Sequence, residues 1–449
     1  SLIIESGAEI NFAGNKFSVT KINNSGTVIL TGKEEISGEI SESGTVIYSG
    51  TETDAKFSWG SNYKNLEIQD GFTGSFENGV IVSDSLKIEN GFEITENQDN
   101  TKNLVEISGT GTLSNTDPIK ITSTGSQSFN GKINLSKILN ITSDGKLTIA
   151  TQSDFTNAGT IKAIGVEINA KGDFTNEGKI DSSNADIRIE SASFTNGAQK
   201  EISAKNMSID SGAVTNAGIL TATGDLVVNA TGDLTSQGKV EVGSELSIKS
   251  QNCTLENEIS AGSIIFEVSS FESFGKINST ENFKLTAKSI KISGKIEAQN
   301  GELETTEANS LFGENSENTF TGKLVVTTAT DFENKGTIIA SEFEVNATTD
   351  FENKGTIEVT SGNFSANVKN NFANNSQITV TTGKLLVNPV INFTNAGTIK
   401  AVGVEVNATG IFTNEGTIAS TSGDVNIKSA RFTNGAEKEI LAKNMSIDS

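Results

Sequence analysis

A short phrase recurs along the second two thirds of the chain at an interval of about twenty residues. It reads Phe155-Thr-Asn-Ala-Gly159-Thr-Ile near the start of this region and Phe412-Thr-Asn-Glu-Gly416-Thr-Ile near its end. Fifteen successive first positions cover 277 residues in fourteen steps, so the mean period is 19.8 residues. A fixed period of this size predicts a repeat architecture in which each coil stacks on the next one.

All fifteen first positions of the phrase are apolar, and ten of them are Phe. Val214, Leu234, Leu255, Ile290 and Leu311 take the place where Phe is absent. Asn stands two residues further on in eleven repeats, and Gly stands four residues further on in ten. We expect each Gly to turn a corner with positive φ, because Gly does so with little steric strain.

Residues that recur at one place in every coil come to lie above one another, so the phrase predicts columns of like side chains. A Phe column in register would be buried, and each Asn amide would hydrogen-bond the copies above and below it. The predicted ladder residues are Phe155, Phe174, Phe194, Phe332, Phe351, Phe372, Phe393, Phe412 and Phe432, with Asn157, Asn176, Asn196, Asn334, Asn353, Asn395, Asn414 and Asn434.

Between these corners the sequence alternates apolar and polar residues, as in Val166-Glu-Ile168-Asn-Ala170. Such alternation is typical of short, half-buried strands, and no sustained helical stripe competes with it. We therefore predict an all-β chain that forms a parallel β-solenoid with about 20 residues per coil. Dividing 449 residues by 19.8 gives roughly 22 coils.

The regularity of the repeat divides the chain in two. Residues 1–150 keep the alternation, but the turn residues between the strands recur less regularly, which predicts variable coils with loop decorations. Residues 151–449 form the regular solenoid, and within them 155–210 align on 393–448 without a gap, with 41 of 56 residues identical. The offset of 238 residues equals twelve coils, so the super-repeat begins again near residue 391.

The first copy of this block also bears on the end of the chain. There, Met207-Ser-Ile-Asp-Ser211 leads straight into Gly212 and another coil, whereas the second copy stops at Ser449. We therefore expect a continuation beyond Ser449.

Composition excludes several classes of function. The chain has no His, so catalysis by imidazole and His-ligated zinc are both excluded. It carries 34 basic and 56 acidic residues, a net charge of −22, which disfavours nucleic acid and anionic membrane surfaces as partners. No apolar run approaches the roughly 20 residues of a membrane span, so membrane insertion is not expected. Since Arg188 and Arg431 occupy different phases of the coil and the carboxylates are spread along it, we predict no enzyme, no catalytic residue and no bound cofactor.

Three features are candidate sites. Tyr48, Phe57, Trp59 and Tyr63 gather the only Trp and both Tyr within sixteen residues, so they form either a ligand patch for sugars or proteins or a set of rings that closes a loop over the core. Cys253, the single cysteine, is either a small buried hydrophobe or a cross-link between two chains.

The third feature is a pair of Asp columns. Asp154 and Asp173 precede successive Phe markers, as do Asp331 and Asp350. Carboxylates about 4.8 Å apart on neighbouring coils would suit Ca²⁺, which makes them weak candidates for a metal site. The alternating Glu and Lys residues that follow Asp331 and Asp350 instead favour a solvated face whose charges offset each other, and both interpretations stay open.

The Phe-Thr-Asn-x-Gly-x-Ile phrase, the period near twenty and the near absence of Cys resemble the filamentous-haemagglutinin-type exoproteins of Gram-negative bacteria over about residues 155–449. The resemblance implies a right-handed β-helix, export through a partner outer-membrane transporter, and service as an adhesin or as the carrier of a terminal effector. The family's amino-terminal secretion domain has no evident counterpart in residues 1–150.

Three hypotheses for function follow. The first is a rod segment of a large secreted or cell-surface bacterial protein, an adhesin or exoprotein stalk whose partners are further coils of the same parent chain. The second is an extracellular filament, sheath or coat that assembles from copies of this chain. The third is a carbohydrate-binding surface near Trp59 and Tyr63 that binds a host or cell-surface glycan or protein. All three place the protein outside the cell or on its surface.

Overall fold

The computed structural model describes residues 1–51, 55–60, 62–69, 72, 146–151 and 154–449. Between 73 and 145 it describes the backbone of eight strands: β9 Gly74–Ser75, β10 Val80–Ile88, β11 Glu93–Thr95, β12 Val105–Ile107, β13 Thr112–Asn115, β14 Ile119–Ser123, β15 Gln127–Leu135 and β16 Leu139–Ser143. This described part contains strands and turns and no helix. It divides into two compact units, Ser1–Thr223 and Gly224–Ser449.

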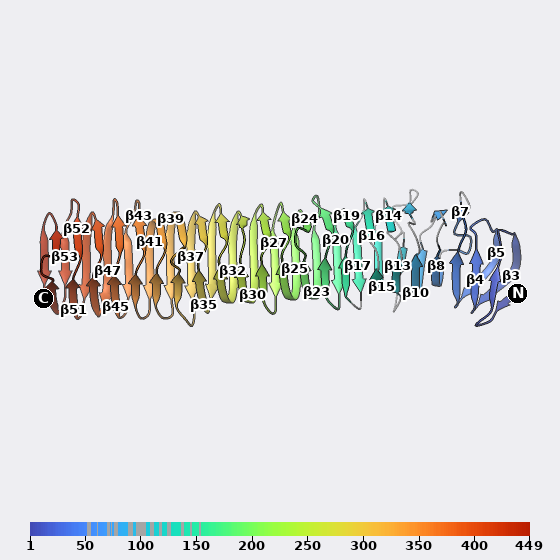
Figure 1. Cartoon of the computed structure of the whole chain (residues 1–449), viewed down its shortest axis with the longest axis horizontal. Coiled ribbons are helices and arrows are strands. Elements are labelled where there is room, and N and C mark those ends of the chain that lie inside the picture. Colours follow the sequence, from blue (N-terminus) through green and yellow to red (C-terminus); the bar gives the residue numbers. More distant parts are fainter. Residues whose placement is uncertain are drawn as a thin grey trace. The chain divides into compact units, whose positions relative to one another are not determined.

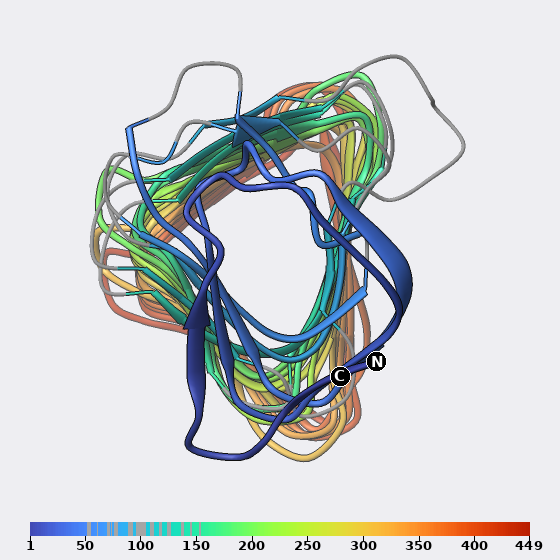
Figure 2. The same cartoon turned by 90° about the vertical axis from the view of Figure 1, so that its right-hand side faces the viewer.

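Each coil of the regular region passes through three parallel sheets in turn. We name them after the residues that they turn inward: the Phe sheet, the Ile sheet and the Val sheet. Within each unit, every strand pairs in parallel with its counterpart on the neighbouring coils, which lie side by side in Figure 1. Figure 2 shows the coils end-on, with the strands of each unit surrounding the interior of that unit.

The regular coils of the first unit show this order. The Phe sheet contains β18 Phe155–Asn157 and β21 Phe174–Asn176, and the Ile sheet contains β19 Thr160–Ala163, β22 Lys179–Ser182, β24 Glu201–Ala204 and β26 Ile219–Ala222. The Val sheet contains β17 Leu147–Thr151 and β20 Val166–Ala170. The long strands β23 Ile187–Asn196 and β25 Met207–Asn216 run from the Val sheet into the Phe sheet.

The second unit repeats the pattern. Its Phe sheet contains β28 Leu234–Ser236, β35 Ser289–Ile292, β38 Ser310–Phe312, β40 Phe332–Asn334, β42 Phe351–Asn353, β45 Asn371–Asn374, β48 Asn392–Asn395, β51 Ile411–Asn414 and β54 Arg431–Asn434. Its Ile sheet contains β29 Lys239–Val242, β31 Ile259–Ala261, β33 Lys276–Ser279, β36 Lys295–Ala298, β43 Thr356–Val359, β46 Gln377–Val380, β49 Thr398–Ala401, β52 Thr417–Ser420 and β55 Glu439–Leu441.

The Val sheet of the second unit contains β27 Leu226–Ala230, β34 Asn282–Ala287, β37 Asn300–Thr305, β44 Phe364–Val368, β47 Lys384–Val390, β50 Gly403–Ala408, β53 Val425–Lys428 and β56 Met445–Asp448. Four long strands belong to two sheets. β30 Glu245–Leu255 and β32 Ser263–Ser273 join the Val and Phe sheets, whereas β39 Glu317–Thr328 and β41 Thr337–Ala347 join the Ile and Val sheets.

The first seventy residues wind in the same way with more irregular coils. β1 Leu2–Ile4, β3 Phe17–Asn24 and β5 Ile36–Glu42 form a three-stranded sheet of their own. β2 Glu9–Asn11, β4 Thr27–Leu30, β6 Thr45–Tyr48 and β8 Asn62–Ile68 pair successively in parallel, and β7 Ala55–Lys56 pairs with β9.

The predicted fold class is confirmed: the chain is a parallel β-solenoid with coils of about 20 residues. The part of the chain that the structure describes has about 18 turns, whereas the expected 22 came from dividing the whole length by the period. The right-handed winding implied by the family resemblance stays a prediction, as does the change of regularity near residue 150. The division that the structure itself shows falls between Thr223 and Gly224.

The interior is built by alternation. In β43 the side chains of Ile357 and Val359 are buried while those of Thr356 and Glu358 are half-buried on the outer face. The Phe residues of successive coils pair with one another in register and stack, and the ring centroids of Phe393 and Phe412 lie 4.8 Å apart with an interplanar angle of 9°. Burial of these apolar columns is the main favourable contribution to folding.

Two coils correct the predicted column. The register pairs Leu234 with Cys253 and Cys253 with Phe271, so Cys253 rather than Leu255 occupies the first position. Ser310 likewise takes the place assigned to Leu311, since it pairs with both Ile290 and Phe332. The assignments of Leu255 and Leu311 to the column are therefore wrong. Leu255 is buried like Cys253, two residues before it, and only the register separates the two. Leu311 faces outward, because alternate residues of a strand face opposite sides.

The explanation for the Gly of the phrase is also wrong. Gly178, Gly355, Gly397 and Gly416 do not have positive φ. A Cβ atom on Gly178 would instead lie 1.9 Å from the carbonyl oxygen of Gly159 on the preceding coil. Gly is required here because the backbones of adjacent coils approach too closely for any side chain.

Candidate functional site

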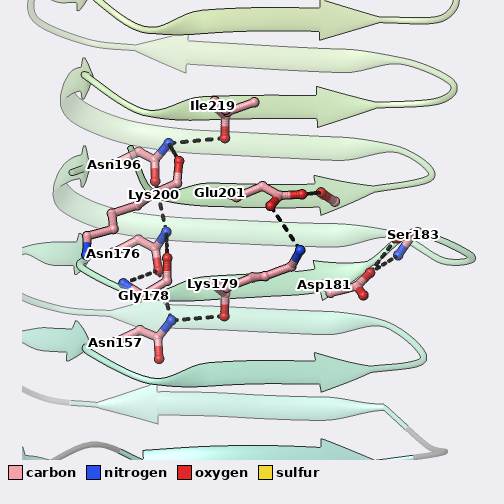
Figure 3. Close-up of polar contacts among 11 residues, drawn as sticks. Asn157, Asn176, Gly178, Lys179, Asp181, Ser183, Asn196, Lys200, Glu201 and Ile219 are labelled. Atoms are coloured by element: carbon pink, nitrogen blue, oxygen red, sulfur yellow. Dashed lines mark hydrogen bonds and ion pairs between the residues drawn. The ribbon is translucent and has the colours of Figure 1, made fainter. Parts of the chain in front are cut away.

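The Asn residues of the phrase form two ladders of amide hydrogen bonds inside the solenoid. In the first unit, Asn157 Nδ2 donates to Asn176 Oδ1 at 2.8 Å, and Asn176 Nδ2 donates to Asn196 Oδ1 at 2.8 Å (Figure 3). In the second unit the donors follow the same direction from Asn334 to Asn353, Asn374, Asn395, Asn414 and Asn434, at 2.7–2.9 Å. Each amide both donates and accepts, so the ladder continues from coil to coil.

The second ladder begins where the column changes residue type. Phe312 pairs with Asn334, so the coil before Asn334 has no amide in this column. Asn334 Oδ1 is consequently buried without a hydrogen-bond partner, whereas its Nδ2 donates to the next coil. Asn434, at the end of the second ladder, is exposed, whereas the ladder residues from Asn157 to Asn196 and from Asn334 to Asn414 are buried and serve as internal scaffolding.

The aromatic cluster near residue 60 is also internal. The side chains of Tyr48, Trp59 and Tyr63 are 0%, 2% and 3% exposed, and Phe57 is half-buried against Tyr48 with ring centroids 4.6 Å apart. The two Tyr hydroxyls lie 3.1 Å apart, and Tyr48 Oη accepts the backbone N–H of Trp59. This arrangement matches the interpretation in which the rings close a loop over the core, and none of these three rings presents a face on which a sugar could stack.

Sequence reasoning missed the partner of Trp59. Its indole Nε1 donates to Glu42 Oε2 at 2.8 Å, and Asn24 Nδ2 donates to both oxygens of the same carboxylate at 3.0 Å. Glu42 stands two residues before Gly44, as Asn24 stands before Gly26, which is the spacing of Asn and Gly in the repeated phrase. Burial of the Glu42 carboxyl group raises its pKa above the usual value. The spacing alone would have identified Glu42 as an occupant of the Asn column.

A second carboxylate, Glu34, lies nearby in sequence and is 5% exposed, whereas Glu42 is half-buried. Its oxygens accept the backbone N–H groups of Gly14, Thr31 and Gly32, each at 2.8 Å. Burial by itself would raise the pKa of Glu34, but these N–H donors outweigh it and the pKa is lowered. Glu34 thus fixes the turn at residues 31–34.

The Asp columns act on the corners between coils. Asp154 Oδ1 accepts the backbone N–H of Asp173 at 2.9 Å, and Asp331 Oδ1 accepts that of Asp350 at 3.1 Å. Asp350 Oδ1 in turn accepts the backbone N–H of Asn371 at 3.0 Å. Among the described residues no group of three or more Asp, Glu or Cys side chains is arranged to hold a metal ion. Calcium binding at these positions stays a prediction.

The outer face beside these columns carries paired charges. Lys354 Nζ lies 2.9 Å from Glu333 Oε1 and 2.8 Å from Glu352 Oε2, and Lys335 Nζ lies 3.1 Å from Glu333 Oε2. Burial would raise the pKa of Glu333, but the two Lys side chains lower it. The columns of opposite sign therefore compensate each other, as the solvated-face interpretation requires.

Cys253 is 1% exposed and occupies the column that Phe fills elsewhere. Burial raises the pKa of its thiol far above the usual value, so the reactive thiolate form is suppressed. This placement is that of a small buried hydrophobe.

One face of the second unit is hollowed. Two adjoining depressions of about 410 and 310 Å³ lie over the outer side of the Val sheet and share Asn388 in their linings. The first is lined by Thr327, Asn346, Thr348, Asn367 and Lys369, and the second by Glu405, Asn407, Asn426 and Lys428. This surface was not among the sites predicted from the sequence, because the apolar-polar alternation shows which residues face outward but not where the outer face is concave.

In the part of the chain that the structure describes, no helix is long and apolar enough to span a membrane. The sequence model of the haemagglutinin repeat matches residues 107–178, 72 of the 449 residues. No curated protein and no solved structure matches the chain. Haemagglutinin-repeat proteins are a structural and adhesin family, typically secreted or exposed on the cell surface. The haemagglutinin repeat and the parallel β-solenoid together fit a filamentous-haemagglutinin-like β-helical repeat protein.

Proposed function

We propose that this chain is a stalk segment of a large secreted or cell-surface bacterial protein, which holds a distal binding or effector region away from the cell. The observation that carries the proposal is the continuity of the interior. Phe, Ile and Val columns and the Asn ladders repeat from coil to coil, so each coil is stabilised mainly by its neighbours. Such an interior can be extended by adding coils, which is the property that a spacer needs.

The exterior supports the same proposal. Opposite charges on neighbouring coils compensate each other, as Lys284 and Glu302 do at 3.1 Å, and the buried polar side chains serve the scaffold. At family level, the haemagglutinin repeat and the β-solenoid support a rod of the adhesin or exoprotein type.

Negative-stain electron microscopy of the purified chain over a concentration series, with and without Ca²⁺, tests the proposal. We expect single rods of constant length at every concentration. Filaments that lengthen with concentration would contradict the stalk and favour the alternative, an extracellular filament or coat formed from copies of this chain. Rods whose length or integrity depends on Ca²⁺ would support a calcium site at the Asp columns.

A further inference from the structure

The hollow over the Val sheet of the second unit contains a row of side-chain amides, one per coil. Asn346 in β41 pairs with Asn367 in β44, and Asn367 pairs with Asn388 in β47. The register between β47 and β50 is irregular after Val387, which pairs with Val406, but Asn407 in β50 lines the same depression as Asn388 and so continues the row on the next coil. We call Asn346, Asn367, Asn388 and Asn407 the amide row. Unlike the internal Asn ladders, it faces outward: Asn367, Asn388 and Asn407 are exposed and Asn346 is half-buried.

The duplicated block offers a comparison for one member of the row, Asn407. Asn169 in the first copy corresponds to Asn407 in the second at the offset of 238 residues. Asn169 Nδ2 donates to Glu190 Oε2 at 2.9 Å, so its amide is held by the next coil. The second copy has Lys428 in place of Glu190, and an ammonium group cannot accept a hydrogen bond from an amide. Asn407 therefore keeps an amide that is open to a ligand.

The chemistry of the lining restricts the ligand. Around the depression of about 410 Å³, Lys369 is the one charged residue, and the other polar side chains are Thr and Asn. A chain with a net charge of −22 repels an anionic polymer. The depression that holds Asn346 and Asn367 contains no carboxylate, and in the adjoining one Glu405 and Asp448 stand beside Lys428, so the row presents no excess of negative charge that would attract a cationic polymer. An uncharged ligand is the best match.

The face also excludes recognition by strand addition. The backbone groups of β41, β44 and β47 are used in pairing with the coils on either side, so an extended peptide finds no free strand edge on this face. What remains are amides that can donate and accept, repeated at the coil spacing of about 4.8 Å across the strands. Sugar hydroxyls also donate and accept, and a linear glycan laid across the strands would meet an equivalent amide on each coil.

We propose that the amide row binds a linear, uncharged glycan, which lies across the strands of the Val sheet. The site is separate from the buried Trp59 cluster and goes beyond the stalk function, because it makes the flank of the stalk an adhesive surface. Asn346 Nδ2 donates to Glu344 Oε1 at 3.1 Å, and Asn346 Oδ1 accepts from Asn367 Nδ2 at 2.8 Å. Asn346 therefore orients Asn367, and the exposed amides of Asn367, Asn388 and Asn407 are the ones that contact the glycan.

The test uses the full chain on an array of linear neutral and linear anionic oligosaccharides, followed by calorimetric titration with the neutral glycan that binds best. In Asn367→Ala/Asn388→Ala we expect about tenfold weaker binding, since two neutral hydrogen bonds to the ligand are lost. Asn367→Thr/Asn388→Thr, which keeps residues that favour strands, should bind as weakly as the Ala variant. Asn169→Ala is the matched control and should bind like the unchanged chain.

Three results would overturn the proposal. The array could retain no neutral glycan, or it could retain only anionic ones. Binding could also survive unchanged in both double variants while circular dichroism shows an intact β spectrum. Sedimentation velocity tests whether a second copy of this chain occupies the face instead of a glycan. If the double variants abolish self-association and leave glycan binding unchanged, the face is an interface between copies of this chain. Rod length in the electron microscope reports on the stalk function independently of all these outcomes.

Discussion

The same interior position is filled in two different ways in two regions of the molecule. In the two ladders of the regular region it holds Asn on Asn, and each amide donates to the next at about the same distance, as Asn157 does to Asn176. In the first seventy residues Asn24 is followed by Glu42, whose carboxylate accepts from Asn24 and from Trp59. The turn is equivalent in both regions, since Gly26 N–H donates to Asn24 Oδ1 as Gly159 N–H donates to Asn157 Oδ1.

The difference shows what allows a solenoid column to repeat. An amide carries donors and an acceptor, so one Asn satisfies the next without outside help. An ionised carboxylate only accepts, so a Glu in the column ends the ladder and needs extra donors from elsewhere. The single Trp of the chain supplies one of them, which explains why an irregular aromatic loop accompanies Glu42.

The largest effect is expected from the aromatic column of the regular region. Phe351 is 1% exposed and its ring lies between those of Phe332 and Phe372, with centroids 5.7 and 4.6 Å away. Phe351→Ala should lower the free energy of unfolding by about 3–5 kcal/mol, because it leaves a cavity in the core. Urea denaturation of the full chain measures the change.

The control is Phe432→Ala. Because Phe432 is half-buried, this substitution should lower the free energy of unfolding by less than Phe351→Ala does. Equal losses for the two variants would mean that the stacked column does not behave as a packed core.

The next largest effect is expected when one amide of the ladder is removed, because each Asn is the hydrogen-bond partner of the next. Asn353 accepts from Asn334 and donates to Asn374, and all three are fully buried. Asn353→Ala should destabilise the chain by about 1–3 kcal/mol, because buried polar groups on both neighbours lose a partner. Amide hydrogen exchange in β40, β42 and β45 would show where protection is lost. Asn434→Ala, at an exposed position, should have a clearly smaller effect, and protection unchanged in both variants would contradict the ladder's role.

The carboxylate version of the column is tested through Trp59. Trp59→Phe keeps a ring of similar character but removes the indole N–H that Glu42 accepts. We expect a loss of about 1–2 kcal/mol, close to that of a hydrogen bond to a charged group. Thermal unfolding followed by near-ultraviolet circular dichroism reports on this region. A variant as stable as the original would show that Glu42 finds its donors without Trp59.

The smallest expected effect is a difference in pH dependence between two carboxylates, the half-buried Glu42 and the buried Glu34. Because the folded pKa of Glu42 is raised, its contribution to stability is fully present below the unfolded pKa and is lost as the pH rises through the folded value. The folded pKa of Glu34 is lowered, so its contribution is present above the unfolded pKa and is lost as the pH falls through the folded value.

Unfolding free energies measured from pH 3 to 7 should therefore separate Glu42→Gln from Glu34→Gln. Compared with the original chain, Glu42→Gln should gain relative stability as the pH rises, and Glu34→Gln should lose it. Parallel pH profiles for the two variants would refute the assignment.

Much of the fold was predictable because the repeat makes every coil face the same packing problem. Phe155 and Asn157 recur at the same two places, so their inward direction and their stacking on Phe174 and Asn176 follow from the period alone. The parallel pairing follows too, since a strand that meets its own copy one coil later must run in the same direction.

Prediction failed where only the neighbouring coil could decide. In the segment around Cys253, two apolar residues an even number apart both point inward, and only the register with Leu234 and Phe271 shows which of them lies in the Phe column. The predicted role of the Gly in the phrase was wrong for the same reason. The atom that excludes a side chain at Gly178 belongs to Gly159, nineteen positions earlier, on the preceding coil.

The period, the fold class and the inward-facing residues could all be predicted from the amino-acid sequence, because they depend on local alternation and on repetition. Tertiary structure alone decided the register of the irregular coils, the pairing of Trp59 with Glu42, and the concave face with its amide row. These features depend on contacts between residues of different coils. A repeat pattern predicts such contacts only where every coil has the same sequence pattern.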